Sequence, residues 1–140
     1  MTRPSSLPSA LAGKGAVRPQ ILVVDDDAFI RQLVVDVLEL EGYEVHEAVD
    51  GAAGILAYDA LRPDCVVLDV MMPGLDGFEV LRRIRAADEM PVPVVMLTAA
   101  GAESASRSWR GGADFFLRKP FEPDQLVGVL ESLLVDTPPA

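Results

Sequence analysis

Five residues that can bind a cation or a phosphoryl group stand at the ends of short apolar runs in this sequence. Asp25 and Asp26 follow the first run, Asp69 ends a later one, and Thr98 and Lys119 stand behind two more. Open α/β sheets gather their functional residues at the carboxyl ends of the strands. If the apolar runs are parallel strands, these five side chains share one rim of the sheet.

The residue types at this predicted rim suit phosphoryl transfer. Clustered carboxylates repel one another, and a hard divalent cation such as Mg²⁺, which takes one or two carboxylates plus a substrate phosphate, relieves that repulsion. The Asp69 carboxylate can then act as a nucleophile and form an acyl phosphate. The Lys119 ammonium group can pair with a phosphoryl oxygen, and the Thr98 hydroxyl can donate a hydrogen bond to the same phosphoryl group. Lysine occurs elsewhere only at position 14, the other basic residues being arginines, which is consistent with a specific requirement at 119.

The elements that must position this rim begin with five predicted strands. Three runs are continuous, apolar and rich in valine, as in strands buried on both faces of a parallel sheet. Two further segments are more polar and are expected nearer the edges. In chain order the predicted strands span residues 21–24, 43–48, 65–68, 92–97 and 114–118.

Segments with helical periodicity alternate with these strands. The first has an apolar face followed by the stop signal Gly42, and the last is entered through Pro123, which suits a first helical turn. The predicted helices lie within residues 30–38, 52–61, 80–84, 102–110 and 126–134. This alternation indicates an α/β fold with a doubly wound sheet of five parallel strands and five helices.

The composition disfavours several classes of protein. The chain has 140 residues, enough for one domain, and its 22 acidic against 12 basic side chains give a net charge of −10. Nucleic acid and anionic membranes both select basic surfaces, so neither is expected as a partner. No apolar run approaches the roughly 20 residues of a membrane span. The single cysteine, Cys65, is expected to be a small buried hydrophobe.

The two ends of the chain differ from its centre. Residues 1–19 are rich in Pro, Ser, Gly and Ala and contain no acidic side chain, which predicts a flexible leader. Residues 136–140 include two prolines and are expected to be a frayed end or the start of a linker. The folded unit is therefore predicted over residues 20–135.

Four short strings give the sequence a resemblance to a known family. They are VVDDD (23–27), VLDVMMPGLDG (67–77), LTA (97–99) and RKPF (118–121). In this order they resemble the receiver domain of two-component response regulators, of the CheY-like, stand-alone type. The resemblance covers roughly residues 20–135 and implies a flavodoxin-like strand order of 2-1-3-4-5.

The resemblance also implies a role for each residue of the rim. Asp69 would accept a phosphoryl group from a histidine kinase or a histidine phosphotransfer protein. Mg²⁺ would be bound by Asp26, Asp69 and the backbone carbonyl of Met71, with Asp25 acting mainly through water.

Further residues are assigned by the same resemblance. Thr98 and Lys119 would contact the phosphoryl oxygens, and Lys119–Pro120 would be a cis peptide. Phe116 stands where the family carries a switch aromatic that swings inward as Thr98 moves.

The implied protein is a phosphorylation-driven switch in a cytoplasmic two-component pathway. It is not expected to be an enzyme with a separate substrate, because it promotes only its own Mg²⁺-dependent phosphorylation and dephosphorylation. A downstream protein would bind the face formed by the fourth helix, the fifth strand and the fifth helix. A monomer and a phosphorylation-dependent dimer are both open.

These residues also admit other interpretations. A phosphorylation-independent pseudo-receiver and a receiver fragment of a longer regulator are alternatives to a stand-alone receiver. A metal-dependent phosphatase is disfavoured because the sequence has no cap insertion. Asp27 is expected to act only as a helix cap, and Trp109 either packs in the core or faces a partner.

The lifetime of the phosphorylated protein can also be predicted. The side chains two residues beyond Asp69 and Thr98 are Met71 and Ala100, and neither can hydrogen-bond an attacking water. Similar domains vary their hydrolysis rates through these two positions. We therefore expect a relatively long-lived phosphoprotein.

Overall fold

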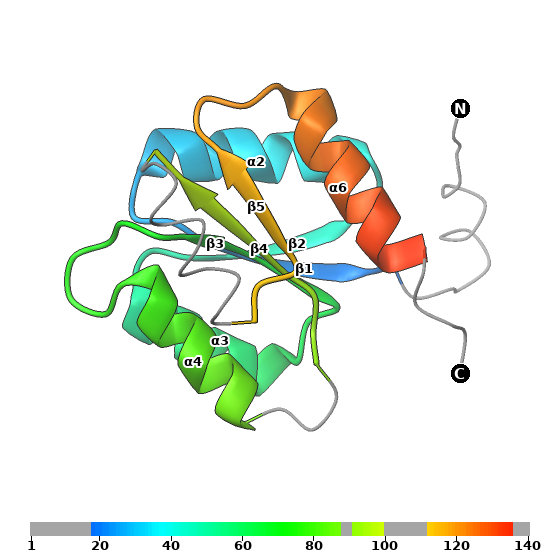
Figure 1. Cartoon of the computed structure of the whole chain (residues 1–140). Helices are drawn as coiled ribbons and strands as arrows, with labels where there is room; N and C mark the ends of the chain where they lie inside the picture. The colour runs from blue at the N-terminus through cyan, green and yellow to red at the C-terminus, as the bar shows by residue number, and fades with distance from the viewer. Residues whose placement is uncertain (1–17, 88–90, 100–111, 136–140) are drawn as a thin grey trace.

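Five parallel strands form one sheet in the order β2-β1-β3-β4-β5, which confirms the predicted fold class and strand order (Figure 1). The computed structural model describes residues 18–87, 91–99 and 112–135. The strands are β1 (Gln20–Val24), β2 (Glu44–Ala48), β3 (Cys65–Asp69), β4 (Val94–Thr98) and β5 (Phe115–Arg118). The helices are α2 (Ala28–Leu40), α3 (Gly51–Leu61), α4 (Gly77–Ala87) and α6 (Pro123–Val135). The predicted fourth helix, at 102–110, and Trp109 with it, lie outside the described residues.

Helices cover both faces of the sheet, with α2 and α6 on one face and α3 and α4 on the other (Figure 1). The central strands β1, β3 and β4 are buried on both faces, so alternate residues of each strand contribute to two separate apolar clusters. In β3, for example, Val66 and Leu68 belong to one cluster and Cys65 and Val67 to the other. Burial raises the pKa of the Cys65 thiol to about 12, in keeping with its predicted role as a buried hydrophobe.

The register of the strand pairs places the carboxyl ends of neighbouring strands side by side. Val24 at the end of β1 pairs with Leu68 of β3, and Asp69 pairs with Leu97 of β4. At the two edges, β2 and β5 carry the more polar sequences, as predicted. Because the strands are parallel, the residues that end or follow β1, β3, β4 and β5 meet at one rim.

Polar caps fix where the helices begin near this rim. The Asp27 carboxylate caps α2 by accepting hydrogen bonds from the backbone N–H groups of Phe29 and Ile30, which confirms its predicted role. Asp76 and Glu79 cap the start of α4 reciprocally, each accepting a hydrogen bond from the other's backbone N–H, at 3.0 and 3.1 Å.

The described chain is held in place from its first strand onward. The carbonyl of Pro19 accepts a hydrogen bond from the N–H of Glu44, and the N–H of Gln20 donates to the carboxylate of Asp64. Of the predicted leader only residues 18 and 19 are described, and the predicted tail lies outside the described residues. Among the helices that the structure describes, none has both the length and the apolar sequence that crossing a bilayer requires.

Candidate functional site

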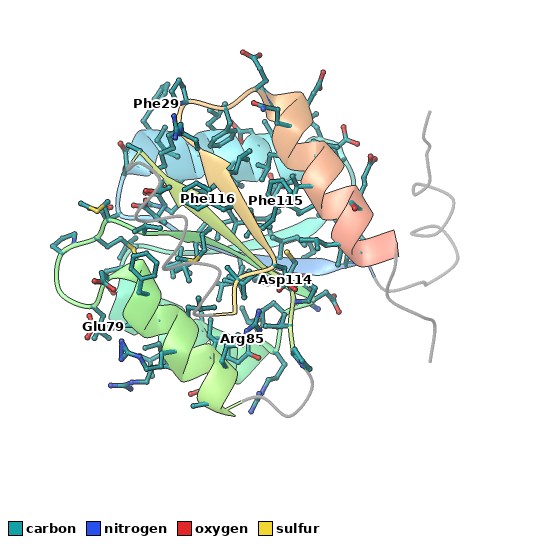
Figure 2. All side chains as sticks on the ribbon, viewed as in Figure 1. Phe29, Glu79, Arg85, Asp114, Phe115 and Phe116 are labelled. Carbon is teal, nitrogen blue, oxygen red and sulfur yellow. The ribbon has the colours of Figure 1, made fainter. Side chains whose placement is uncertain are left out.

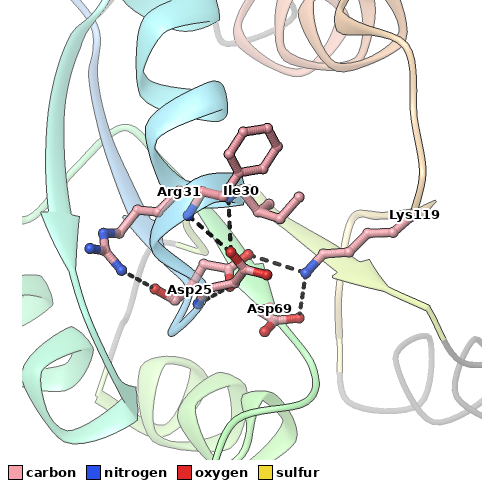
Figure 3. A network of polar contacts seen from close by, with 7 residues as sticks. Asp25, Ile30, Arg31, Asp69 and Lys119 are labelled. Carbon is pink, nitrogen blue, oxygen red and sulfur yellow. Dashed lines mark hydrogen bonds and ion pairs between the residues drawn. The ribbon is translucent and has the colours of Figure 1, made fainter.

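Every polar group of Asp25 accepts or donates a hydrogen bond, and Figure 3 shows its contacts with Arg31 and Lys119. Asp25 directly follows β1 and is fully buried. Its N–H donates to the carbonyl of Ala48 at 3.2 Å, and its own carbonyl accepts from Nη1 of Arg31 at 2.8 Å. Its Oδ1 accepts from the N–H of Asp27 at 2.9 Å, and its Oδ2 accepts from Nζ of Lys119 at 3.2 Å. A buried carboxylate held by these donors is fixed inside the site.

The ammonium group of Lys119 lies between two carboxylates. Its Nζ is 3.2 Å from Oδ2 of Asp25 and 3.2 Å from Oδ1 of Asp69 (Figure 3). Lys119 follows β5, and its backbone N–H donates to the carbonyl of Thr98 at 2.7 Å. The Lys119–Pro120 peptide is cis. The fold therefore brings a cation from one edge strand to carboxylates that follow or end two central strands.

Asp26 completes an acidic cluster. One carboxylate oxygen from each of Asp25, Asp26 and Asp69 can be chosen so that all three atoms lie within 4.8 Å of one another. Asp26 is exposed, and no described residue hydrogen-bonds to its carboxylate. Carboxylate oxygens are the ligands that Mg²⁺ prefers in proteins. The donor set of this cluster therefore fits a magnesium ion.

The charges at the site oppose one another in their effect on protonation. Burial, together with the neighbouring Asp25 carboxylate, raises the pKa of Asp69 from 3.8 to about 6, although Lys119 and a backbone hydrogen bond from Met71 act in the other direction. Burial also disfavours the charged form of Lys119, but the two carboxylates outweigh it and raise the pKa of that side chain. Near neutral pH, Asp69 is therefore ionised beside the ammonium group of Lys119.

The loop after β3 is held close to the site by Gly77. The N–H of Gly77 donates to the carbonyl of Val70 at 2.9 Å. A Cβ atom at position 77 would lie 2.3 Å from the carbonyl oxygen of Asp69 and 2.8 Å from Cα of Val70. Only glycine fits there. Within this closed loop Met71 has an exposed side chain, whereas Met72 is buried in the core.

Thr98 and Phe116, the predicted switch pair, lie on the same face of the sheet. Phe116 is half-buried against the apolar cluster under α3 and α4, and it pairs with Met96 of β4, a member of that cluster. Thr98 stands two residues beyond Met96 and is fully buried, so the alternation of the strand puts it on that same face. The two residues thus occupy neighbouring positions on adjacent strands.

Sequence reasoning missed two residues that contact this site or support it. Arg31 in the first turn of α2 donates to the carbonyl of Asp25, and it forms an ion pair with Glu47 of β2 at 3.0 Å. Neither residue belongs to a recognisable string. The only available signal was a basic side chain shortly after an acidic triplet, which is too common to single out.

Residues 21–131 match the family described as the response regulator receiver domain, and the chain belongs to that family. The predicted family resemblance is thereby confirmed.

Curated relatives of this chain include two transcriptional regulators. The DNA-binding dual master transcriptional regulator RpaA of Synechocystis sp. is 41% identical over 118 residues, which cover 83% of this chain and 49% of that protein. The DNA-binding response regulator MtrA of Mycobacterium tuberculosis is 40% identical over 119 residues, 84% of this chain and 51% of that protein. The chain thus spans about half the length of the curated relatives it matches.

Solved structures with the same fold include isolated receiver domains. The receiver domain of the Francisella response regulator 1452 has a TM-score of 0.81 and 32% identity, covering 86% of this chain and 100% of that chain. The chemotaxis protein CheY4 of Vibrio cholerae has a TM-score of 0.79 and 33% identity, covering 84% of this chain and 100% of that one. The fold of this chain is therefore that of a receiver domain over the whole length of these structures.

Proposed function

We propose that this chain accepts a phosphoryl group on Asp69 from a phosphohistidine of a histidine kinase or histidine phosphotransfer protein. The observation that carries the proposal is the bridging position of Lys119, 3.2 Å from both Asp25 and Asp69, beside the exposed carboxylate of Asp26. One ammonium group among three carboxylates leaves net negative charge at the rim. A divalent cation and a phosphoryl group together match that charge pattern.

Within this proposal the three acidic residues have different tasks. Asp26, Asp69 and the backbone carbonyl of Met71 hold Mg²⁺, which neutralises charge on the phosphoryl oxygens when it is bound. Asp25 acts through water, because both of its carboxylate oxygens already accept hydrogen bonds from Asp27 and Lys119. The exposed Asp26 carboxylate, in contrast, has no described partner that a metal would need to displace.

The transfer itself makes one bond and breaks one bond. An electron pair on an Asp69 oxygen forms the new P–O bond while the P–N bond of the phosphohistidine breaks, and its electrons return to the donor imidazole nitrogen. Asp69 must be ionised to attack, and it is so at neutral pH, above its pKa of about 6. Lys119 then contacts a phosphoryl oxygen, and the Thr98 hydroxyl donates to another.

The proposed output is a change of partner binding. Thr98 moves toward the phosphoryl group, and Phe116, on the same sheet face, moves further inward as Thr98 leaves its place. A downstream protein binds the face that includes β5 and α6 together with the segment 102–110, which lies outside the described residues. The acidic balance of the chain supports a protein partner for this face rather than nucleic acid.

The proposal is tested by phosphorylation with a small donor. The full chain is incubated with MgCl₂ and acetyl phosphate, and its intact mass is measured over time. We expect one phosphoryl adduct in the wild type and none in Asp69→Asn. Asp27→Asn is a matched control, because Asp27 is a neighbouring aspartate whose carboxylate caps α2 and lies outside the acidic cluster.

Different failures of this experiment carry different meanings. No adduct in a wild type that binds Mg²⁺ would identify the chain as a pseudo-receiver that works without phosphorylation. An adduct that persists in Asp69→Asn would place the phosphoacceptor elsewhere. Transfer from a phosphorylated histidine kinase, followed in the same way, then tests the physiological donor.

A further inference from the structure

Arg31 links three elements beside the acidic cluster, and Figure 3 shows its contact with Asp25. It lies in the first turn of α2, and its side chain is only 15% exposed. Its Nη1 donates to the carbonyl of Asp25 at 2.8 Å, and its Nε donates to Oε1 of Glu47 on β2 at 3.0 Å. A planar guanidinium that spans two acceptors holds both in a fixed relative position.

The group that Arg31 holds is the peptide between the two acidic residues after β1. From the other side, the N–H of Asp25 donates to the carbonyl of Ala48 at the end of β2. The Asp25 backbone is therefore fixed at both of its polar groups. Asp26 follows directly, and its carboxylate has no described hydrogen-bond partner, so its position depends on this backbone.

The positive charge of Arg31 is already neutralised by a neighbouring residue. Its ion pair with Glu47 makes the two side chains together neutral. A neutral pair contributes little to the net charge of the nearby cluster. Arg31 therefore affects the site by fixing the position of the Asp25 backbone and not by adding charge.

We infer that Arg31, anchored by Glu47, is a positioning residue for the proposed magnesium site. It orients the Asp25–Asp26 peptide so that the Asp26 carboxylate faces the same point as the Asp69 carboxylate. The inference rests on the proposed function, because it needs a metal at that point. Arg31 contacts neither the metal nor the phosphoryl group.

The test removes the pair without changing the net charge. Mg²⁺ is titrated into the full chain by isothermal calorimetry for the wild type and for the double variant Arg31→Met, Glu47→Gln. We expect the Kd for Mg²⁺ to rise roughly 10-fold, as on loss of an outer partner of a metal ligand. Arg31→Lys keeps the charge but loses the planar fork, so its Kd is expected to rise as well.

The matched control is a similar contact at the opposite end of the strands. Arg85 of α4 donates to the carbonyls of Val92 and Gly112 and pairs with Asp114 at 2.9 Å; Arg85 and Asp114 are labelled in Figure 2. Arg85→Met, Asp114→Asn is expected to lower the unfolding temperature in EDTA while leaving the Kd for Mg²⁺ unchanged. If Arg31 only stabilised the fold, its variants would likewise unfold at a lower temperature and bind Mg²⁺ with an unchanged Kd.

The outcomes separate the inference from the proposed function. If the wild type binds Mg²⁺ and the Arg31, Glu47 double variant binds it equally well, the positioning role is wrong and the proposed site stands. Tighter binding in the single variant Arg31→Met, with an unchanged Kd in Arg31→Lys, would show a role of charge alone and overturn the inference. A wild type that binds no Mg²⁺ overturns the metal site itself. Thermal unfolding of each variant in EDTA verifies that it is folded.

Discussion

Asp69 is ionised at neutral pH in surroundings that oppose its charge. It is buried beside the Asp25 carboxylate, and the ammonium group of Lys119 forms ion pairs with both carboxylates. The raised pKa of Asp69 means that the folded protein binds a proton on this residue more tightly than the unfolded chain does. The reactive group of the proposed site therefore lowers the stability of the metal-free domain.

This loss of stability leads to a pH-dependent prediction for the variant Asp69→Asn in EDTA. The pKa of Asp69 is 3.8 in the unfolded chain and about 6 in the folded protein. The loss of stability caused by its ionisation is therefore fully present above pH 6, and it disappears as the pH falls below 3.8. We expect the variant to be more stable than the wild type by about 3 kcal/mol at pH 7.5, and no more stable near pH 3.5. Urea denaturation at both pH values measures this. The control Glu39→Gln, on an exposed carboxylate, should show no such difference.

The side chain of Met71 gives a second prediction at this scale. It is 65% exposed beside the proposed phosphoryl site, and it cannot hydrogen-bond water. Met71→Asn supplies a group that can hold an attacking water, so we expect its phosphorylated form to decay several-fold faster than that of the wild type. A mass-spectrometric time course in MgCl₂, after removal of acetyl phosphate, measures the decay. Equal lifetimes for Met71→Asn and the control Met71→Leu would contradict the prediction.

At the scale of elements, the loop between β3 and α4 is the part of the site with least spare room. Gly77 begins α4 with its Cα against the carbonyl of Asp69, and the capping pair Asp76 and Glu79 fixes the start of the helix at the same place. The loop that carries Met71 is thus closed by packing on one side and by hydrogen bonds on the other. A shift of α4 would carry this loop with it.

Gly77→Ala tests how tightly this loop is packed. The added Cβ would overlap backbone atoms of β3, which cannot give way as a flexible side chain does, so we expect a loss of about 2 kcal/mol or more of stability. Gly128→Ala in α6 is the matched control, because a Cβ there meets no atom within 4 Å. That control should be stabilised by up to about 1 kcal/mol, since alanine favours a helix. Similar urea midpoints for the two variants would contradict this account of the loop.

At the scale of the whole molecule, the parallel sheet is what assembles the site. β1 and β3 are neighbours in the sheet, and the chain crosses to β2 on one side of β1 before it returns to β3 on the other. Asp25 and Asp69 lie at this reversal, and Lys119 reaches them from the edge strand β5. Because these residues lie far apart in the chain, the acidic cluster exists only when the domain is folded.

Metal binding should therefore stabilise the whole domain. We expect the free energy of unfolding to rise by about 2.7 kcal/mol when free Mg²⁺ reaches 100 times its Kd, and EDTA to reverse the change. Asp26→Asn should lose most of this effect, whereas Asp27→Asn, whose carboxylate is outside the cluster, should keep it. Thermal unfolding across a MgCl₂ series measures both. An equal response of the two variants would argue against Asp26 as a ligand.

Much of this arrangement could be predicted from the sequence. Continuous apolar runs are needed for strands buried on both faces, and helical periodicity between them implies a parallel sheet, so the rim and its five residues followed from pattern alone. Asp27 as a cap and Cys65 as a buried hydrophobe were predicted on similarly local grounds. Strand ends were less well defined, because the predicted fourth strand at 92–97 is Val94–Thr98 in the structure.

Other features were decided only by the tertiary structure. The pattern of apolar runs alone does not distinguish Asp25 from Asp26, yet one is fully buried and held at every polar group while the other is exposed. The contacts of Arg31 with Asp25 and Glu47 likewise depend on how α2 packs against β1 and β2. Periodicity determines which residues share a strand or a helix. Which side chains from different elements then meet is set by the packing of those elements in space, and a sequence pattern does not contain it.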